Sequence, residues 1–133
     1  MALVDTKKMD TPEGYLRRVL EQIDDSHTVL SNLKDKPCDL EIVKRELARI
    51  TGSLQALVNK IAPNKPEFSD YQYLLSPIRT FLENHEFSRE IDTMSLLYSE
   101  DSMRLKNMRL TILDALDEKN LIGHIKSVLR EKN

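Results

Sequence analysis

The sequence predicts an all-α fold in which a long antiparallel helical hairpin packs against three or four shorter helices. Apolar residues recur at spacings of three and four along most of the chain, and no segment shows the alternating period of a strand. Only three glycines and five prolines interrupt the 133 residues. Because this length is that of one ordinary domain, we expect a flexible lead-in over residues 1–10 and a single helical domain over 11–133.

The first helix is predicted over residues 12–34. Thr11 is a suitable N-cap, and Pro12 fits the first helical position because its missing amide would have no partner there. Asp35, Lys36 and Pro37 end the helix, since proline cannot continue it. The predicted inward face is Leu16, Val19, Ile23, Ser26, Leu30 and Leu33.

The second helix has the most regular pattern in the chain, and Asp39 is its expected N-cap. A loop of about four residues predicts that the two helices form an antiparallel hairpin over residues 11–61. In this pairing Leu30 faces Val43, and Ser26 faces Leu47 in the one layer that is not apolar on both sides. The predicted inward face is Leu40, Val43, Leu47, Ile50, Leu54, Leu57 and Ile61.

Several short helices are predicted over residues 67–131, after a boundary marked by two prolines at 63 and 66. The expected helices cover about 77–85, 88–98, 102–118 and 121–131, and the middle two are alternatively one continuous helix. Their predicted inward residues are Ile78, Phe81, Leu82, Ile91, Met94, Leu97, Leu105, Met108, Ile112, Leu116, Leu121, Ile122, Ile125, Val128 and Leu129.

Six of the seven aromatic residues lie between positions 68 and 98. Aromatic side chains are enriched both in cores and at the centres of interfaces, so the cluster has two interpretations, of which we favour the core. Its members are Phe68, Tyr71, Tyr73, Phe81, Phe87 and Tyr98.

The charge balance argues against nucleic acid as a partner. The 20 basic and 22 acidic residues give a net charge of −2, whereas binding to phosphates needs clustered lysine and arginine. We therefore expect no DNA partner and disfavour RNA. No window approaches the roughly 18 apolar residues of a membrane span. The single cysteine, Cys38, is typical of a reducing compartment, so we expect a cytoplasmic or, alternatively, a nuclear protein.

No motif for a metal, a cofactor or a nucleophilic reaction is present, and we expect none of these groups. The segment from Arg79 to His85 resembles the arginine–histidine motif of HEPN-domain ribonucleases, which are small all-helical proteins. This resemblance implies that Arg79 and His85 are an RNA-cleaving pair. In the simpler interpretation Arg79 is an exposed helix residue, and His85 is a helix C-terminal residue favoured by the helix dipole.

Gly52 interrupts the second helix at a position opposite the hairpin seam. Glycine inside a helix costs about 1 kcal/mol relative to alanine, and here Thr51 and Ser53 flank it to form a notch of small residues. We expect this notch to be filled either by a helix of the same chain, which we favour, or by a partner.

The sequence thus favours a non-catalytic helical module for protein–protein interaction, an adaptor, regulator or assembly subunit. Its expected contact surface is Thr51, Gly52 and Ser53, and its expected partner is another protein or a second copy of the chain. The alternative function is a HEPN-like ribonuclease that uses Arg79 and His85.

Overall fold

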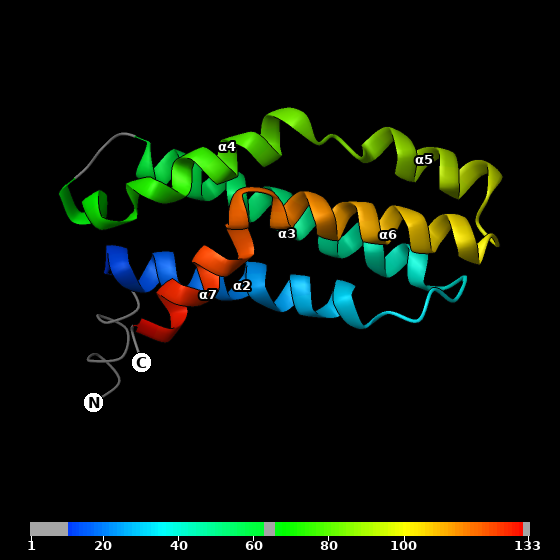
Figure 1. Ribbon diagram of the computed structural model, residues 1–133, viewed down its shortest axis with the longest axis horizontal. Coiled ribbons are helices and arrows are strands. Elements are labelled where there is room, and N and C mark those ends of the chain that lie inside the picture. The colour runs from blue at the N-terminus through cyan, green and yellow to red at the C-terminus, as the bar shows by residue number, and fades with distance from the viewer. Residues whose placement is uncertain (1–10, 63–65, 132–133) are drawn as a thin grey trace.

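The computed structural model describes residues 11–62 and 66–131, and every regular element within them is a helix (Figure 1). The predicted all-α bundle is therefore confirmed. The predicted flexible lead-in, residues 1–10, lies outside the described residues.

The first helix, α2 (Pro12–Asn32), begins as predicted, because the Thr11 hydroxyl accepts a hydrogen bond of 3.0 Å from the Gly14 amide. It buries one residue that was not predicted, Leu20. This wider buried face arises because α2 packs not only against α3 but also against α6 and α7. The buried residues of α2 are Leu16, Val19, Leu20, Ile23, Ser26 and Leu30.

The start of α3 (Asp39–Ile61) differs from the prediction, since Cys38 and not Asp39 occupies the N-cap position. The Asp39 carboxylate instead accepts hydrogen bonds from the backbone amides of Lys34 and Lys36, at 3.2 and 3.1 Å. It thereby satisfies amides of the loop that joins α2 to α3 rather than those of its own helix.

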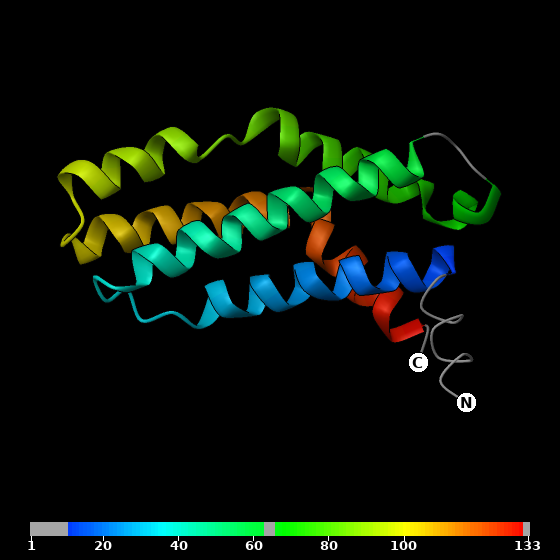
Figure 2. The same ribbon diagram turned by 180° about the vertical axis from the view of Figure 1, so that it is seen from behind.

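α2 and α3 run side by side in opposite directions and form the most extensive helix pair of the described chain (Figure 2). In their interface the Ser26 hydroxyl donates a 2.8 Å hydrogen bond to the buried carboxylate of Glu46, the neighbour of its predicted partner Leu47. Arg45 lies 2.9 Å from the same carboxylate. Burial raises the pKa of Glu46, but the hydrogen bonds from Ser26 and Arg45 outweigh it and lower the pKa overall.

The second half of the chain begins with a 3-10 segment, η1 (Pro66–Leu74), and continues through α4 (Leu75–Asn84) and α5 (Ser88–Leu97). A turn separates α5 from α6 (Ser102–Asp117), so these two helices are not continuous. The Asp101 carboxylate caps α6, because it accepts a hydrogen bond of 3.0 Å from the backbone amide of Arg104.

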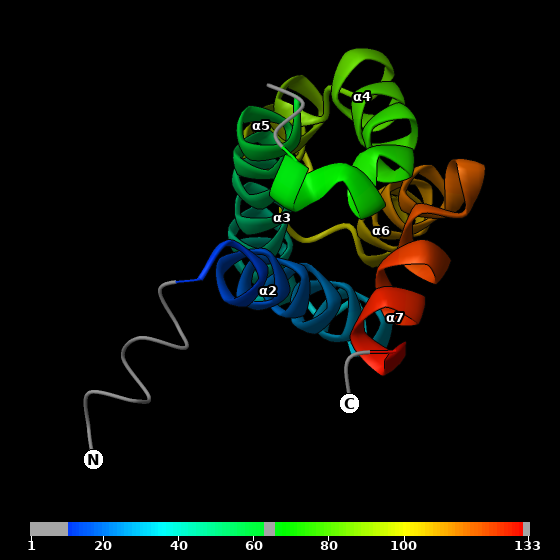
Figure 3. The same cartoon turned by 90° about the vertical axis from the view of Figure 1, so that its left-hand side faces the viewer.

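A short 3-10 turn, η2 (Glu118–Asn120), connects α6 to the last helix, α7 (Leu121–Glu131). Lys119 and Asn120 both have a φ of 56°, and at this point the chain turns out of the line of α6 into α7 (Figure 1). Viewed end on, α2, α3, α4 and α6 surround the core, and α7 lies beside α2 and α6 (Figure 3).

Most of the predicted inward residues are buried, but Leu97 is 69% exposed, and its predicted burial is wrong. Ile91, Met94 and Leu97 are spaced by three residues, and each such step falls about 60° short of a full helical turn. Leu97 is therefore rotated away from the face that buries Ile91 and Met94. Leu33, Leu82 and Leu129 are partly buried against the core.

The aromatic cluster belongs mainly to the core. Phe68, Tyr71 and Phe81 are buried, and Phe87 and Tyr98 pack partly buried against the same core. Tyr73 is the exception, with 47% of its surface exposed.

Candidate functional site

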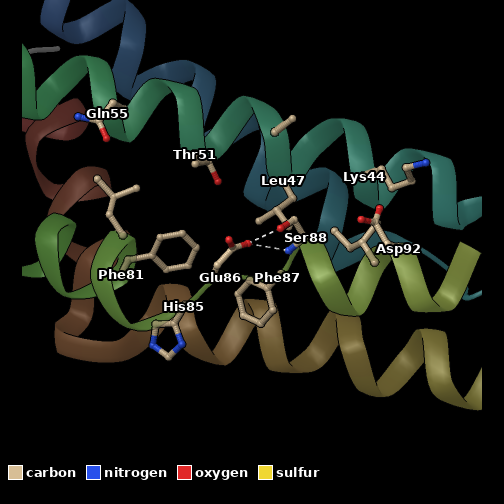
Figure 4. Close-up of a pocket in the computed structure, with 13 residues that line it drawn as sticks. Lys44, Leu47, Thr51, Gln55, Phe81, His85, Glu86, Phe87, Ser88 and Asp92 are labelled. Atoms are coloured by element: carbon tan, nitrogen blue, oxygen red, sulfur yellow. Dashed lines mark hydrogen bonds between the residues drawn. The ribbon is translucent and has the colours of Figure 1, made fainter.

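A groove of about 660 Å³ lies between the outer face of α3 and the connection from α4 to α5 (Figure 4). This volume is within the range of roughly 300–1,000 Å³ that is typical of binding clefts. The groove is lined by Lys44, Leu47, Ala48, Thr51, Gln55, Phe81, Leu82, His85, Glu86, Phe87, Ser88, Ile91 and Asp92.

One wall of the groove is a stripe along α3 made by Lys44, Ala48, Thr51 and Gln55. Residues spaced by three or four share one face of a helix. At a rise of about 1.5 Å per residue, this stripe is about 16 Å long, or three helical turns. The wall is therefore straight, regular and as long as a short helix.

The opposite wall is shaped by the end of α4. His85 has an extended backbone with φ −128° and ψ 99°, and side chains alternate in direction along extended backbone. His85 and Phe87 lie on the α6 side of the connection, whereas Glu86 lies between the connection and α3 (Figure 4).

Contacts on the α6 side hold this connection. His85 Nε2 is 2.6 Å from the Glu118 carboxylate, and the rings of His85 and Phe87 stack with centroids 6.0 Å apart. The side chain of Glu86 points to the opposite side of the connection, toward the groove (Figure 4).

The carboxylate of Glu86 is held in its charged form. It accepts hydrogen bonds from the hydroxyl and the amide of Ser88, the latter at 3.0 Å, and these bonds lower the pKa of Glu86. Ser88 is the first residue of α5, so the same carboxylate also satisfies an amide that has no partner within that helix.

The bottom of the groove is apolar. Leu47, Phe81 and Ile91 are buried and close its base, and Leu82 and Phe87 are partly buried beside them. The site therefore combines an apolar base with charged groups at its opening.

Of the three residues predicted as a contact surface, only Thr51 lines the groove. Successive helix residues are turned by about 100°, so Gly52 lies at the edge of the groove and Ser53 beyond it. Gly52 is exposed, and a Cβ atom added there would meet no atom within 4 Å. The favoured expectation that a helix of the same chain fills the notch is therefore wrong.

We expect Gly52→Ala to raise the free energy of unfolding by about 0.5–1 kcal/mol, because the new methyl group has open space and alanine favours the helix. Urea denaturation measures this change. The same substitution at Gly123, where the Cβ would collide with the side chain of Asn120, should give a smaller gain or a loss. A destabilised Gly52→Ala variant would show that the position is covered.

The structure does not bring Arg79 and His85 together. Arg79 is exposed on α4 and does not line the groove that His85 borders. Within the described residues, the contacts of the His85 ring are with Glu118, Phe81 and Phe87.

In residues 11–62 and 66–131, no group of three or more histidine, cysteine, aspartate or glutamate side chains is placed to hold a metal ion. Burial lowers the pKa of His27, and the nearby Asp24 carboxylate lies 3.1 Å from the Lys126 ammonium group. None of the helices described has both the length and the apolar character needed to cross a bilayer.

Comparison of the chain with protein-family models, with curated proteins and with solved structures finds no match. The site is therefore interpreted from its own geometry.

Sequence reasoning missed Glu86, Phe87 and Asp92 as site residues. Their one signal is an acidic, aromatic stretch after a helix end, and only tertiary packing places this stretch opposite α3.

Proposed function

We propose that this protein is a non-catalytic helical module for protein–protein interaction, an adaptor, regulator or assembly subunit. Its contact surface is the outer face of α3, with Thr51 inside the groove and Gly52 and Ser53 beside it. The observation that carries the proposal is the groove itself, which has an apolar base, a wall about three helical turns long and an open edge at Gly52. Grooves of this kind bind the apolar face of a partner helix.

The expected partner is another protein, with a second copy of the chain as the alternative. DNA is not an expected partner and RNA is disfavoured, because the net charge of −2 supplies no excess of cations for phosphate binding. With one cysteine in the sequence, we place the protein in the cytoplasm, with the nucleus as the alternative.

The test is photo-crosslinking in cells that express the full chain. A photoreactive phenylalanine analogue at position 51 should give discrete protein adducts, whereas the same group at position 31, on α2, should not. Ala48→Arg should abolish these adducts without unfolding the protein, because Ala48 is exposed on the groove wall and arginine is a good helix former. Circular dichroism checks the fold.

Asn59→Arg is the matched control, since Asn59 is also exposed on α3 but does not line the groove. It should leave the adducts unchanged. Adducts that contain two copies of the chain, together with a dimer in sedimentation experiments that Ala48→Arg disrupts, would identify self-association. Absence of adducts from position 51, in a protein that stays monomeric, would refute the proposal.

The ribonuclease alternative gains no support from the positions of Arg79 and His85. RNA cleavage by the purified protein that is lost in both Arg79→Ala and His85→Ala would nevertheless reverse the ranking. The interaction module should cleave no RNA.

A further inference from the structure

We infer that the groove beside α3 recognises a basic amphipathic helix of a partner protein, with a lysine or arginine of that helix paired to Glu86. This inference rests on the proposed function and specifies the chemistry of the partner. It is carried by the charges at the opening of the groove.

Glu86 is the central charged group of the groove. Its carboxylate lies between α3 and the α4–α5 connection, where one oxygen accepts both hydrogen bonds from Ser88 (Figure 4). The second oxygen has no hydrogen bond within the described residues. A charged carboxylate in this position favours a cationic group that enters the groove with the ligand.

Asp92 extends this preference along α5. Like Glu86, it is exposed and makes no ion pair within 4 Å among the described residues. The positive charge of Arg89 lowers the pKa of Glu86 slightly through a longer-range electrostatic interaction, without an ion pair between the two side chains. The single cation that lines the groove, Lys44, is already 3.7 Å from the carboxylate of Glu41 on its own helix.

The groove therefore offers two carboxylates that make no ion pair within 4 Å among the described residues, and an apolar base made by Leu47, Phe81 and Ile91. A helix that fits it needs apolar residues at spacings of three and four on one face, and lysine or arginine beside that face. An acidic helix with the same apolar face would place like charges against Glu86 and Asp92, so the groove also discriminates against it.

The probes are two synthetic peptides of three to four helical turns with the same leucine face. One carries lysines and the other glutamates at the flanking positions. Fluorescence anisotropy with the full chain should show at least about tenfold tighter binding of the lysine peptide. Added salt should reduce this preference, because exposed ion pairs are screened.

Glu86→Gln combined with Asp92→Lys should remove or invert the preference. Glutamine can still accept the hydrogen bonds of Ser88, and Asp92 is exposed, so the fold should survive. The matched control is Asp25→Asn combined with Asp70→Lys, which changes the net charge equally at two exposed residues away from the groove. The control should keep the preference.

Three results would overturn the inference: equal binding of the two peptides, tighter binding of the glutamate peptide, or loss of the preference to the same extent in both double variants. The last result would assign the preference to overall charge. Position 51 can still form adducts in cells, and Ala48→Arg can still abolish those adducts. In that case the proposed interaction module stands, and only the basic character of the partner helix is wrong. If those adducts are also absent, the proposed function itself fails.

Discussion

Ile50→Asp should destabilise the protein by more than about 4 kcal/mol, a large part of the roughly 5–15 kcal/mol by which an ordinary domain is stable. Ile50 has no exposed surface and lies on the face of α3 that packs against α2. An aspartate there must either bury an unpaired charge or become protonated, and both cost several kcal/mol. Urea denaturation followed by circular dichroism measures the loss.

Two neighbouring substitutions on α3 make this prediction specific. Leu47→Asp should cost less than Ile50→Asp, because Leu47 is 7% exposed and borders the groove, where a carboxylate can reach water. Thr51→Asp, on the exposed face, should cost less than about 1 kcal/mol. An Ile50→Asp variant that unfolds at the same urea concentration as the parent would refute the assignment of the buried face.

The buried faces of the long helices could be predicted from the sequence because a helix that packs on one side repeats its apolar residues at a fixed period. Leu105, Met108, Ile112 and Leu116 illustrate this, since all four are predicted to face inward and all four are buried. Leu20 was missed because α2 is covered on more than one side, and the pattern of the hairpin seam contains no information about α6 and α7.

The groove could not be predicted, because it is formed by segments that are distant in sequence. The stripe that contains Thr51 and the carboxylate of Glu86 are brought together by the bend after α4, where His85 contacts Glu118. The sequence alone shows that a glycine at position 52 is unusual inside a helix. The expected occupant of the notch was wrong, because helix propensity reveals the cost of a glycine and not what lies beside it.

Arg109 is the clearest case of a structural residue that one sequence does not reveal. It follows Met108 on the buried side of α6, and its guanidinium donates to both carboxylate oxygens of Asp35, at 2.7 and 2.9 Å. It also donates to the carbonyl of Leu30 at 3.1 Å. Asp35 lies 74 positions earlier in the loop after α2, so no periodic pattern links the two residues.

The pair connects the loop between α2 and α3 to α6. The hydrogen bonds to Asp35 raise the pKa of Arg109 further above its already high value, so the guanidinium remains charged. The side chains are only 9% and 13% exposed. Loss of one partner therefore leaves the other charge poorly solvated.

Arg109→Met should destabilise the protein by about 3 kcal/mol, because it leaves the Asp35 carboxylate and the Leu30 carbonyl without their donors. Asp35→Asn should cost less, since asparagine keeps an acceptor and tolerates the φ of 64° at this position. In the double variant no charge is left unpaired, so its loss in unfolding free energy should be smaller than the sum of the two single losses. Urea denaturation of all four proteins measures the coupling. If the two losses simply add, the ion pair contributes nothing beyond its separate groups, and the attachment of the loop to α6 must then depend on the bond between Arg109 and Leu30.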